Sequence, residues 1–429
     1  MSAAAKQLAG MLDELGRVSD EPGKLTRTFL SPAMRRANAR VAHWMRAAGL
    51  TVREDATGNL IGRLEACRAG SPDSAAGSKN GGVRRPRPTK TLLFGSHLDT
   101  VRDAGRFDGA LGVLLPIVAL GELRRRGVEL PFAVEVLGFS EEEGVRFSSA
   151  YLGSKGYAGR LSASDLKQRD ADDVTVRAAL KKFNRGRFSL PKPAHRASNL
   201  IGYFEVHIEQ GPVLEKRRLA VGVVSAIAGQ TRGRLTFRGK AGHAGTTPMA
   251  LRRDALAAAA EFVLFAETLS RGCEPLLATV GTIAVTPGAP NVIPGEAALS
   301  LDVRHPLDSS RRSALALLRD VAKMIARRRK LSVAWQRTQD NGAVACSPKL
   351  TALFDQSVRA VQRRSVSLVS GAGHDAVVMS ALTPVAMLFV RCRDGLSHHP
   401  DEFASPADLA VALRVVIDFL LRLAHDSSR

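Results

Sequence analysis

Five separate segments of the chain carry histidine and carboxylate side chains of the kind that bind metal ions. The candidate ligands are His97, Asp108, Glu143, His207 and His398. Imidazole and carboxylate donors without a thiolate favour a borderline or hard divalent cation, such as Zn²⁺, Mn²⁺, Co²⁺ or Ni²⁺. Two such ions bridged by a carboxylate and a water would supply a nucleophile at neutral pH, and an unliganded glutamate beside them could accept the water's proton.

The acidic run Glu141–Glu143 is the most unusual of these segments, because three adjacent carboxylates repel one another unless cations or protons compensate. Alone, such a triplet is more often a solvated turn, and a lone buried histidine is more often a core residue than a ligand. The prediction of a metal site therefore depends on all five segments occurring together.

Short apolar runs lie before the candidate ligands and predict buried strands. The runs are Thr91–Ser96, Phe132–Ser140, Ile201–Val206 and Val385–Val390, and a helical pattern at Ala110–Arg126 follows Asp108. Buried strands that alternate with helices indicate an α/β domain whose mixed central sheet has helices on both faces. Ligands bind at the carboxyl ends of strands in such sheets, so we expect the candidate side chains to converge there.

A different pattern occupies residues 224–338. Alternating apolar and polar residues predict half-buried strands, and two long helical patterns lie between them. The strands are expected at Arg234–Arg238, Leu277–Val285 and Ala297–Arg304, and the helices at Arg252–Leu269 and Ser309–Arg329. We therefore predict a catalytic metal-binding domain at 1–223 and 339–429, with an α+β sandwich inserted at 224–338.

The composition limits the classes of partner. The net charge of +21 is concentrated in basic runs at 68–90, 160–196 and 323–330. Aromatic residues make up only 5% of the chain and do not interleave with these runs, so the stacking platforms that single-stranded nucleic acids need are missing. We expect a solvated basic surface and no nucleic-acid partner. Residues 67–90, rich in Gly, Ser, Pro and Arg, predict a flexible insertion.

The chain shows no sign of a membrane or an oxidising compartment. No apolar run reaches the ~18–20 residues that cross a bilayer, and Met1–Asp20 lacks the apolar stretch of a signal peptide. The four cysteines form no C-x-x-C pair, which argues against a disulfide framework or a zinc ribbon. We expect a cytoplasmic protein without a membrane partner.

Seven sequence blocks, in order along the chain, resemble the signature of one enzyme family. They are GSHLDTV…GRFDGALGVL, SEEEGVRFSSAYLGSKGYAG, FEVHIEQGPVLE, GKAGHAGTTPMALRRDA, NVIPG…LDVRHP, SGAGHDA and GLSHHPDEF. With these blocks the chain resembles the allantoate amidohydrolase and N-carbamoyl-L-amino-acid hydrolase family. That family belongs to the dinuclear metallopeptidase superfamily that includes carboxypeptidase G and the aminoacylases.

The resemblance implies two divalent cations per subunit, Zn²⁺ or Mn²⁺ with Co²⁺ or Ni²⁺ as alternatives. Asp108 would bridge them, His97 and His207 would bind one ion, and Glu143 and His398 would bind the other. The register within Glu141–Glu143 is open, and this assignment aligns the last glutamate before Gly144 with the ligand.

The same resemblance implies two further roles at the catalytic centre. Glu142, the residue before the liganding glutamate, would be the general base, and Asp99 would orient His97 by accepting its ring N–H.

The resemblance also implies that the inserted domain is a lid that closes over the active site and forms a homodimer. His243 would then be a catalytic, substrate-binding donor to the developing oxyanion, although it could instead cap the following helix. Asn291 and Arg304 would anchor the substrate carboxylate, and Gln210 would bind the ureido group. The main chain of Gly371 and Ala372 would line the pocket.

The predicted function is hydrolysis of the ureido group of allantoate, a small anionic substrate of purine catabolism, with release of ammonia and CO₂. N-carbamoyl-L-amino acids and ureidoglycolate need the same anchors and stay as alternatives. Two segments depart from the family pattern: the basic segment at 160–198, a region that in the family lies beside the substrate site, and the 67–90 loop, an insertion into a tighter strand connection.

Two rival functions are weaker on the sequence. A dipeptide metallopeptidase would need space for a side chain where the ureido group sits, and HIEQG argues against it. A metal-free basic binding protein would usually have lost a ligand, whereas all five are present.

Overall fold

The computed structural model describes residues 2–67 and 90–427, and the chain divides into two compact units. Unit 1 comprises Met1–Ser225, Cys346–Leu368 and Gly373–Arg429, and unit 2 comprises Ala226–Ala345 and Val369–Ala372. The predicted boundary at residue 338 lies inside a strand of unit 2, Ser332–Asn341. The flexible insertion expected at 67–90 lies, apart from its two end residues, outside the described residues.

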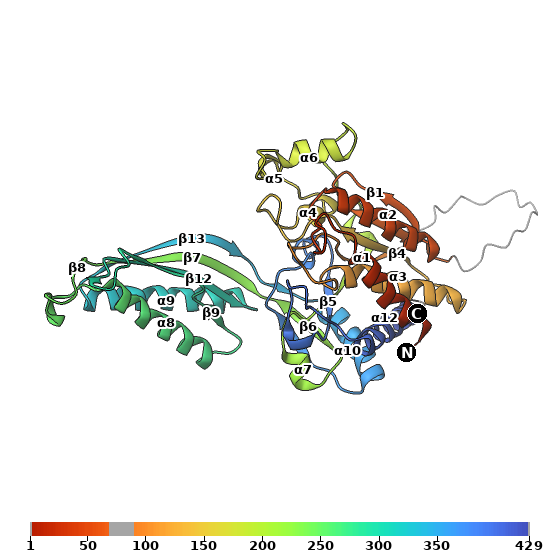
Figure 1. The fold of residues 1–429 in the computed structure, drawn as a ribbon. Helices are drawn as coiled ribbons and strands as arrows, with labels where there is room; N and C mark the ends of the chain where they lie inside the picture. The colour runs from red at the N-terminus through yellow and green to blue at the C-terminus, as the bar shows by residue number, and fades with distance from the viewer. Residues whose placement is uncertain (1, 68–89, 428–429) are drawn as a thin grey trace, which may run out of the picture. The chain divides into compact units, whose positions relative to one another are not determined.

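Unit 1 is built on a mixed sheet whose strands were mostly expected from the apolar runs (Figure 1). Its strand order is β1 (Thr51–Glu54), β2 (Leu60–Leu64), β4 (Ala133–Phe139), β3 (Thr91–His97), β5 (Leu200–Ile208), β16 (Val385–Val390) and β6 (Val221–Ile227). The four strands β4, β3, β5 and β16 run parallel to one another, whereas β2 and β6 flank them antiparallel. The carboxyl ends of the four parallel strands therefore lie along one edge of the sheet.

Helices cover both faces of this sheet, as expected for an α/β domain. One face carries the main apolar core, to which five long helices contribute: α1 (Ala3–Leu15), α2 (Pro32–Ala47), α3 (Ala110–Arg125), α10 (Pro348–Gln362) and α12 (Pro406–Ser427). Side chains alternate along a strand, so Phe204 and Val206 point into that core and Glu205 points to the opposite face. There the Glu205 carboxylate accepts the main-chain N–H of Ala376, the first residue of α11 (Ala376–Met379).

Short helical segments complete unit 1. They are α4 (Leu152–Tyr157), α5 (Ala163–Lys167), α6 (Val176–Phe183), α7 (Val213–Arg217), η1 (Ala197–Asn199) and η3 (Arg393–Gly395). The helices α5 and α6 pack with Phe29 and Phe147 in a small core of their own. Among the described residues, no helix combines the length and the apolar character that a membrane span requires.

Unit 2 is the inserted α+β unit that the sequence predicts. Its antiparallel sheet has the order β10 (Ile283–Thr286), β12 (Glu296–His305), β7 (Gly229–Arg238) and β13 (Ser332–Asn341), with β9 (Leu277–Thr279) also pairing with β12. The helices α8 (Ala255–Gly272) and α9 (Asp308–Arg328) lie along one face of this sheet (Figure 1) and share its apolar core.

The remaining elements of unit 2 are short. β8 (Gly242–His243) pairs with β11 (Val292–Ile293), and η2 (Met249–Leu251) lies between β8 and α8. β14 (Val344–Ala345) pairs with the end of β6, and β15 (Ser367–Ser370) also pairs with β6.

Candidate metal centre

The parallel strands deliver the candidate ligands to one edge of the unit 1 sheet. His97 is the last residue of β3, His207 is the last but one of β5, and Glu143 follows the end of β4. Asp108 enters from the loop before α3, where Gly109 has a φ of +64°. A Cβ atom at Gly109 would lie 2.5 Å from the ring of His97, so only glycine lets this loop approach the end of β3.

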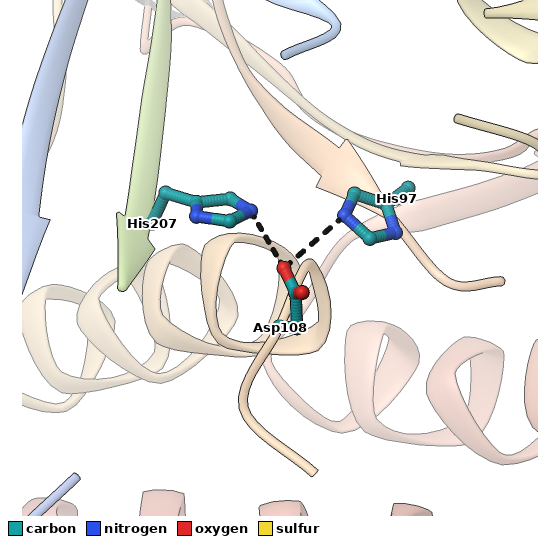
Figure 2. A group of neighbouring side chains, drawn as sticks. All are labelled: His97, Asp108 and His207. Carbon is teal, nitrogen blue, oxygen red and sulfur yellow. Dashed lines mark ion pairs between the residues drawn. The ribbon is translucent and has the colours of Figure 1, made fainter. Parts of the chain in front are cut away.

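The carboxylate of Asp108 is at the centre of the cluster. Its Oδ1 lies 3.0 Å from Nε2 of His207 and 3.6 Å from Nε2 of His97. Figure 2 marks these two contacts by dashed lines. Its Oδ2 lies 3.2 Å from Nε2 of His398, and that ring nitrogen is 3.6 Å from Oε1 of Glu143. Each oxygen of Asp108 therefore faces a different group of donors, which is the arrangement of a carboxylate able to bridge two cations.

The other ring nitrogens of His97 and His207 contact main-chain carbonyls. Nδ1 of His97 lies 3.0 Å from the carbonyl oxygen of Asp99, and Nδ1 of His207 lies 2.9 Å from that of Ile208. A carbonyl can only accept, so each neutral ring carries its hydrogen on Nδ1 and leaves the Nε2 lone pair free. Both Nε2 atoms face Asp108, where a metal ion would bind.

Asp99 holds the acidic loop as well as the end of β3. Its carboxylate accepts the main-chain N–H groups of Glu142 at 3.0 Å and of Glu143 at 3.2 Å. The same carboxylate lies 3.5 Å from Nδ1 of His97, which is farther than the Asp99 carbonyl. In this structure the main chain of Asp99 orients His97, and the side chain of Asp99 orients the glutamates.

The three glutamates of the acidic run have different surroundings. The Glu141 carboxylate accepts the main-chain N–H groups of Gly144 and Leu152, so it closes the loop on itself. Ligand atoms of Glu142 and Glu143 lie within 4.8 Å of one another and of His97, and Glu143 also belongs to a group with Asp108 and His398. This geometry supports Glu143 as the ligand and leaves Glu142 beside it.

Burial makes the ionisation of Glu142 and Glu143 unfavourable without a compensating cation. It raises the pKa of Glu142 well above the usual range and that of Glu143 to about 7. Burial also opposes ionisation of Asp108, but hydrogen bonds from His207, His398 and His97 outweigh it and hold the Asp108 pKa well below its usual range. His97, Asp108 and His207 are buried, whereas the side chain of His398 is 50% exposed. A set of imidazoles and carboxylates without a thiolate fits a divalent metal ion.

Gln210 lies among the candidate ligands. Its backbone has a φ of +54°, and its Nε2 is 3.1 Å from Oδ2 of Asp108 and 3.1 Å from Oγ of Ser397. The side-chain amide therefore reaches the edge of the centre, where it can donate to an acceptor. His374 lies behind His207, with 4.6 Å between the ring centroids, and burial holds its pKa well below the usual value, so it packs as a neutral ring.

The candidate substrate residues of unit 2 form two pairs. His243 ends β8 and pairs with Val292 of β11, and Asn291 is the residue before β11. The N–H of Ala244 donates to the Asn291 carbonyl at 2.9 Å. Nδ1 of the exposed His243 ring accepts the N–H of Gly245 at 3.0 Å. The hydrogen of a neutral ring is then on Nε2, where it can be donated to an oxygen atom.

Arg304 and Gly371 form the second pair. The Arg304 guanidinium donates to both oxygens of Asp302, at 3.0 Å and 2.9 Å, and to the carbonyl of Gly371. Three of its five N–H groups are used, so two are left for a carboxylate. Arg304 and Gly371 also line a pocket of about 510 Å³ within unit 2. Ala372 stays beside this pair, its N–H held by Oγ of Ser370 at 3.2 Å.

Several residues that hold the candidate ones in place were not predicted from the sequence, notably Asp302, Ser397 and Glu402. Asp302 lies two positions before Arg304 on β12, on the same face of the strand, which was a usable signal. Ser397 and Glu402 flank His398 in GLSHHPDEF, but nothing in their spacing shows that they contact Asp108 or its loop.

Comparison with known proteins matches nearly the whole chain. The family model described as Peptidase family M20/M25/M40 matches residues 93–422. The chain is 39% identical to allantoate deiminase 2 of Glycine max, over 96% of this chain and 88% of that protein. It is 37% identical to the N-carbamoyl-L-amino-acid amidohydrolase of Pseudomonas sp. (strain NS671), over 96% and 95% of the two chains. Among solved structures, a hydantoinase/carbamoylase family amidase from Burkholderia multivorans superposes with a TM-score of 0.88 at 32% identity, covering 98% of each chain.

Proposed function

The chain belongs to peptidase family M20/M25/M40 and is a hydrolase of C–N bonds other than peptide bonds, and from this premise we propose that its substrate is allantoate. The observation that carries the proposal is the Asp108 carboxylate, whose oxygens face His97 and His207 on one side and His398 and Glu143 on the other. The relatives named allantoate deiminase support the choice of substrate.

We propose that His97, His207, Asp108, Glu143 and His398 hold two divalent cations, Zn²⁺ or Mn²⁺, with Co²⁺ or Ni²⁺ as alternatives. Such ions, when bound, lower the pKa of water and polarise a carbonyl group. The donor set supports this assignment because it contains three imidazoles, two carboxylates and no thiolate.

Glu142 is the proposed general base. Its carboxylate would take a proton from the attacking water and pass it to the leaving ureido nitrogen. Burial raises its pKa, which brings the carboxylate toward the range in which it can both accept and release a proton near neutral pH. Its main-chain N–H is held by Asp99, so the side chain is presented from a fixed loop.

Unit 2 and Gln210 supply the proposed substrate contacts. Arg304 would grip the substrate carboxylate with the N–H groups that Asp302 and Gly371 leave free, aided by Asn291. Gln210 would bind the ureido group through its amide, and the main chain of Gly371 and Ala372 would line the pocket. His243 would donate its Nε2–H to the oxyanion that develops during attack.

We also propose that the chain forms a homodimer through residues 224–338. Leu264 on α8 and Leu317 and Met324 on α9 are 65%, 44% and 59% exposed, which suits a face that a second copy covers. Light scattering after gel filtration tests this, and a monomer at all concentrations contradicts it. Replacement of Leu264 and Met324 by aspartate should dissociate the dimer if these side chains form the interface.

A substrate panel tests the proposed function. Protein stripped with a chelator and reloaded with Mn²⁺ or Zn²⁺ is assayed for ammonia release from allantoate, and for cleavage of N-carbamoyl-L-amino acids, ureidoglycolate and dipeptides. We expect the highest kcat/KM with allantoate, and no turnover before metal is returned. A higher kcat/KM with a carbamoyl amino acid or ureidoglycolate would make that compound the substrate in place of allantoate. Turnover of dipeptides alone would overturn the assignment of a ureido substrate.

A further inference from the structure

Glu402 is a buried carboxylate directly behind the candidate metal centre. It lies between β16 and α12, is only 3% exposed, and is not among the groups whose atoms could share a metal ion in the described residues. Its Oε1 accepts the main-chain N–H groups of Phe107 at 2.9 Å and Asp108 at 3.1 Å. Glu402 therefore fixes the main chain of the residue that lies at the centre of the site.

The second oxygen of Glu402 reaches the side chain of Asp108 through Ser397. Oγ of Ser397 is 3.0 Å from Oε2 of Glu402 and also 3.0 Å from Oδ2 of Asp108. A hydroxyl has one hydrogen, so it serves only one of these carboxylates at a time. When Asp108 uses Oδ2 for another contact, Ser397 can turn its hydrogen to Glu402 and stay satisfied.

The loop before Asp108 is shaped around Glu402. A Cβ atom at Gly105 would lie 2.3 Å from Cβ of Glu402 and 2.4 Å from its carboxylate, so any side chain there would displace Glu402. Gly105 and Glu402 are far apart in the sequence, and their close fit joins the Asp108 loop to the segment that carries His398.

We propose that Glu402 is a positioning residue for the metal centre. It sets the main chain of Asp108 directly and shares the hydroxyl of Ser397 with the Asp108 carboxylate. Both contacts hold the Asp108 loop in register with His398, the residue after Ser397. The inference rests on the proposed function only in taking Asp108 as a metal ligand. Because Glu402 acts on the ligands, its loss should weaken metal binding more than substrate binding.

Calorimetric titration of the metal-stripped protein with Mn²⁺ tests the proposal. We expect Glu402→Ala to weaken Mn²⁺ binding about 10- to 100-fold, the usual effect of removing a group that orients a ligand. At saturating Mn²⁺ its kcat should fall about 10-fold while KM changes less than about 3-fold. Glu402→Gln keeps an oxygen for both N–H groups and can donate to Ser397, so it should restore binding to within about 5-fold of the parent protein.

Glu135→Gln is the matched control, because Glu135 is also a buried carboxylate, 2% exposed, but its partners are Arg63, Tyr157 and His195. It should lower the temperature of unfolding without changing Mn²⁺ affinity. Ser397→Ala, a milder change, should weaken Mn²⁺ binding about 3- to 10-fold and gives the same test if Glu402→Ala does not fold.

The proposal is overturned if Glu402→Ala or Ser397→Ala binds Mn²⁺ as the parent protein does. It is also overturned if Glu402→Gln is no better than Glu402→Ala, because general destabilisation would then explain the loss. Titration needs no substrate, so failure of the allantoate assay leaves this result readable, and failure of the titration leaves the substrate assignment standing.

Discussion

The side chain of Asp99 accepts the main-chain N–H of Glu143 at 3.2 Å. Asp99 follows β3 and Glu143 follows β4, so this bond ties together the loops at the ends of two neighbouring parallel strands. The carbonyl of Asp99 holds the ring of His97 in addition. One residue thus sets the positions of two candidate ligands that are 46 positions apart in the chain.

Asp99→Asn should weaken the metal centre. An asparagine side chain offers one acceptor oxygen and an NH₂ group, so one of the two N–H groups of Glu142 and Glu143 would face a donor in place of an acceptor. We expect Mn²⁺ affinity to fall about 10-fold or more, as measured by calorimetric titration. The exposed Asp320 provides a control for the loss of a single charge, and equal affinities for Asp99→Asn and Asp320→Asn would contradict the role given to Asp99.

Glu142→Gln should separate proton transfer from metal binding. Glutamine cannot accept the water's proton, so kcat should fall about 10²- to 10⁴-fold, whereas elemental analysis should find the metal content of the parent protein. Glu143→Gln is the companion variant, and it should lose bound metal. If Glu142→Gln empties the site and Glu143→Gln does not, the ligand lies one position earlier in the acidic run.

His243→Ala should reduce turnover with no change in metal content. The variant lacks the Nε2–H that we assign to the developing oxyanion, and the loss of one such donor lowers kcat by about 100-fold. Steady-state kinetics with metal analysis on the same sample provides the measurement. An unchanged kcat would exclude the histidine from the mechanism and leave it as a structural residue of the β8–β11 ribbon.

Stability below neutral pH should depend on Glu135. Burial opposes its ionisation, but His195, Tyr157 and Arg63 together lower its pKa from 4.5 to about 2. A carboxyl group with a depressed pKa stabilises the fold above its unfolded pKa, and this contribution disappears as the pH falls from 4.5 toward 2. The full contribution is on the order of 3 kcal/mol.

Glu135→Gln should therefore unfold at a lower temperature than the parent protein at pH 7, and the difference should shrink as the pH falls below about 4.5. Thermal unfolding followed by circular dichroism between pH 3 and pH 7 measures this. A difference that stays constant across the series would show that the charge of Glu135 contributes nothing to stability.

Much of the fold was predictable because its central strands are fully buried. The sequences of β3, β4 and β16 are nearly continuous apolar runs, which is typical of strands buried on both faces, and each strand was predicted close to its observed bounds. β13 was not predicted, because its sequence SVAWQRTQDN is largely exposed and offers few apolar residues. The short helices α5 and α6 were not predicted either, because five and eight residues form only one to two turns, too few for a helical repeat to be recognised.

The residues of the candidate site were likewise predicted only in part. His97, Asp108 and His207 were expected to converge because parallel strands bring their carboxyl ends to one edge, and the structure places them together. The contacts of Glu402 with Phe107 and Asp108 span about 295 positions of sequence and follow no periodicity, so no sequence pattern could predict them. The candidate metal ligands could be predicted from residue type, whereas the residues that position these ligands could be identified only from the structure.

The orientation of the His97 and His207 rings depends on the carbonyl groups of Asp99 and Ile208, which contact Nδ1 of each ring. Both acceptors belong to the main chain, so a substitution at position 99 or 208 keeps the carbonyl group that accepts from the ring. Substrate specificity can therefore change through substitutions at these positions while both rings keep Nε2 directed at Asp108.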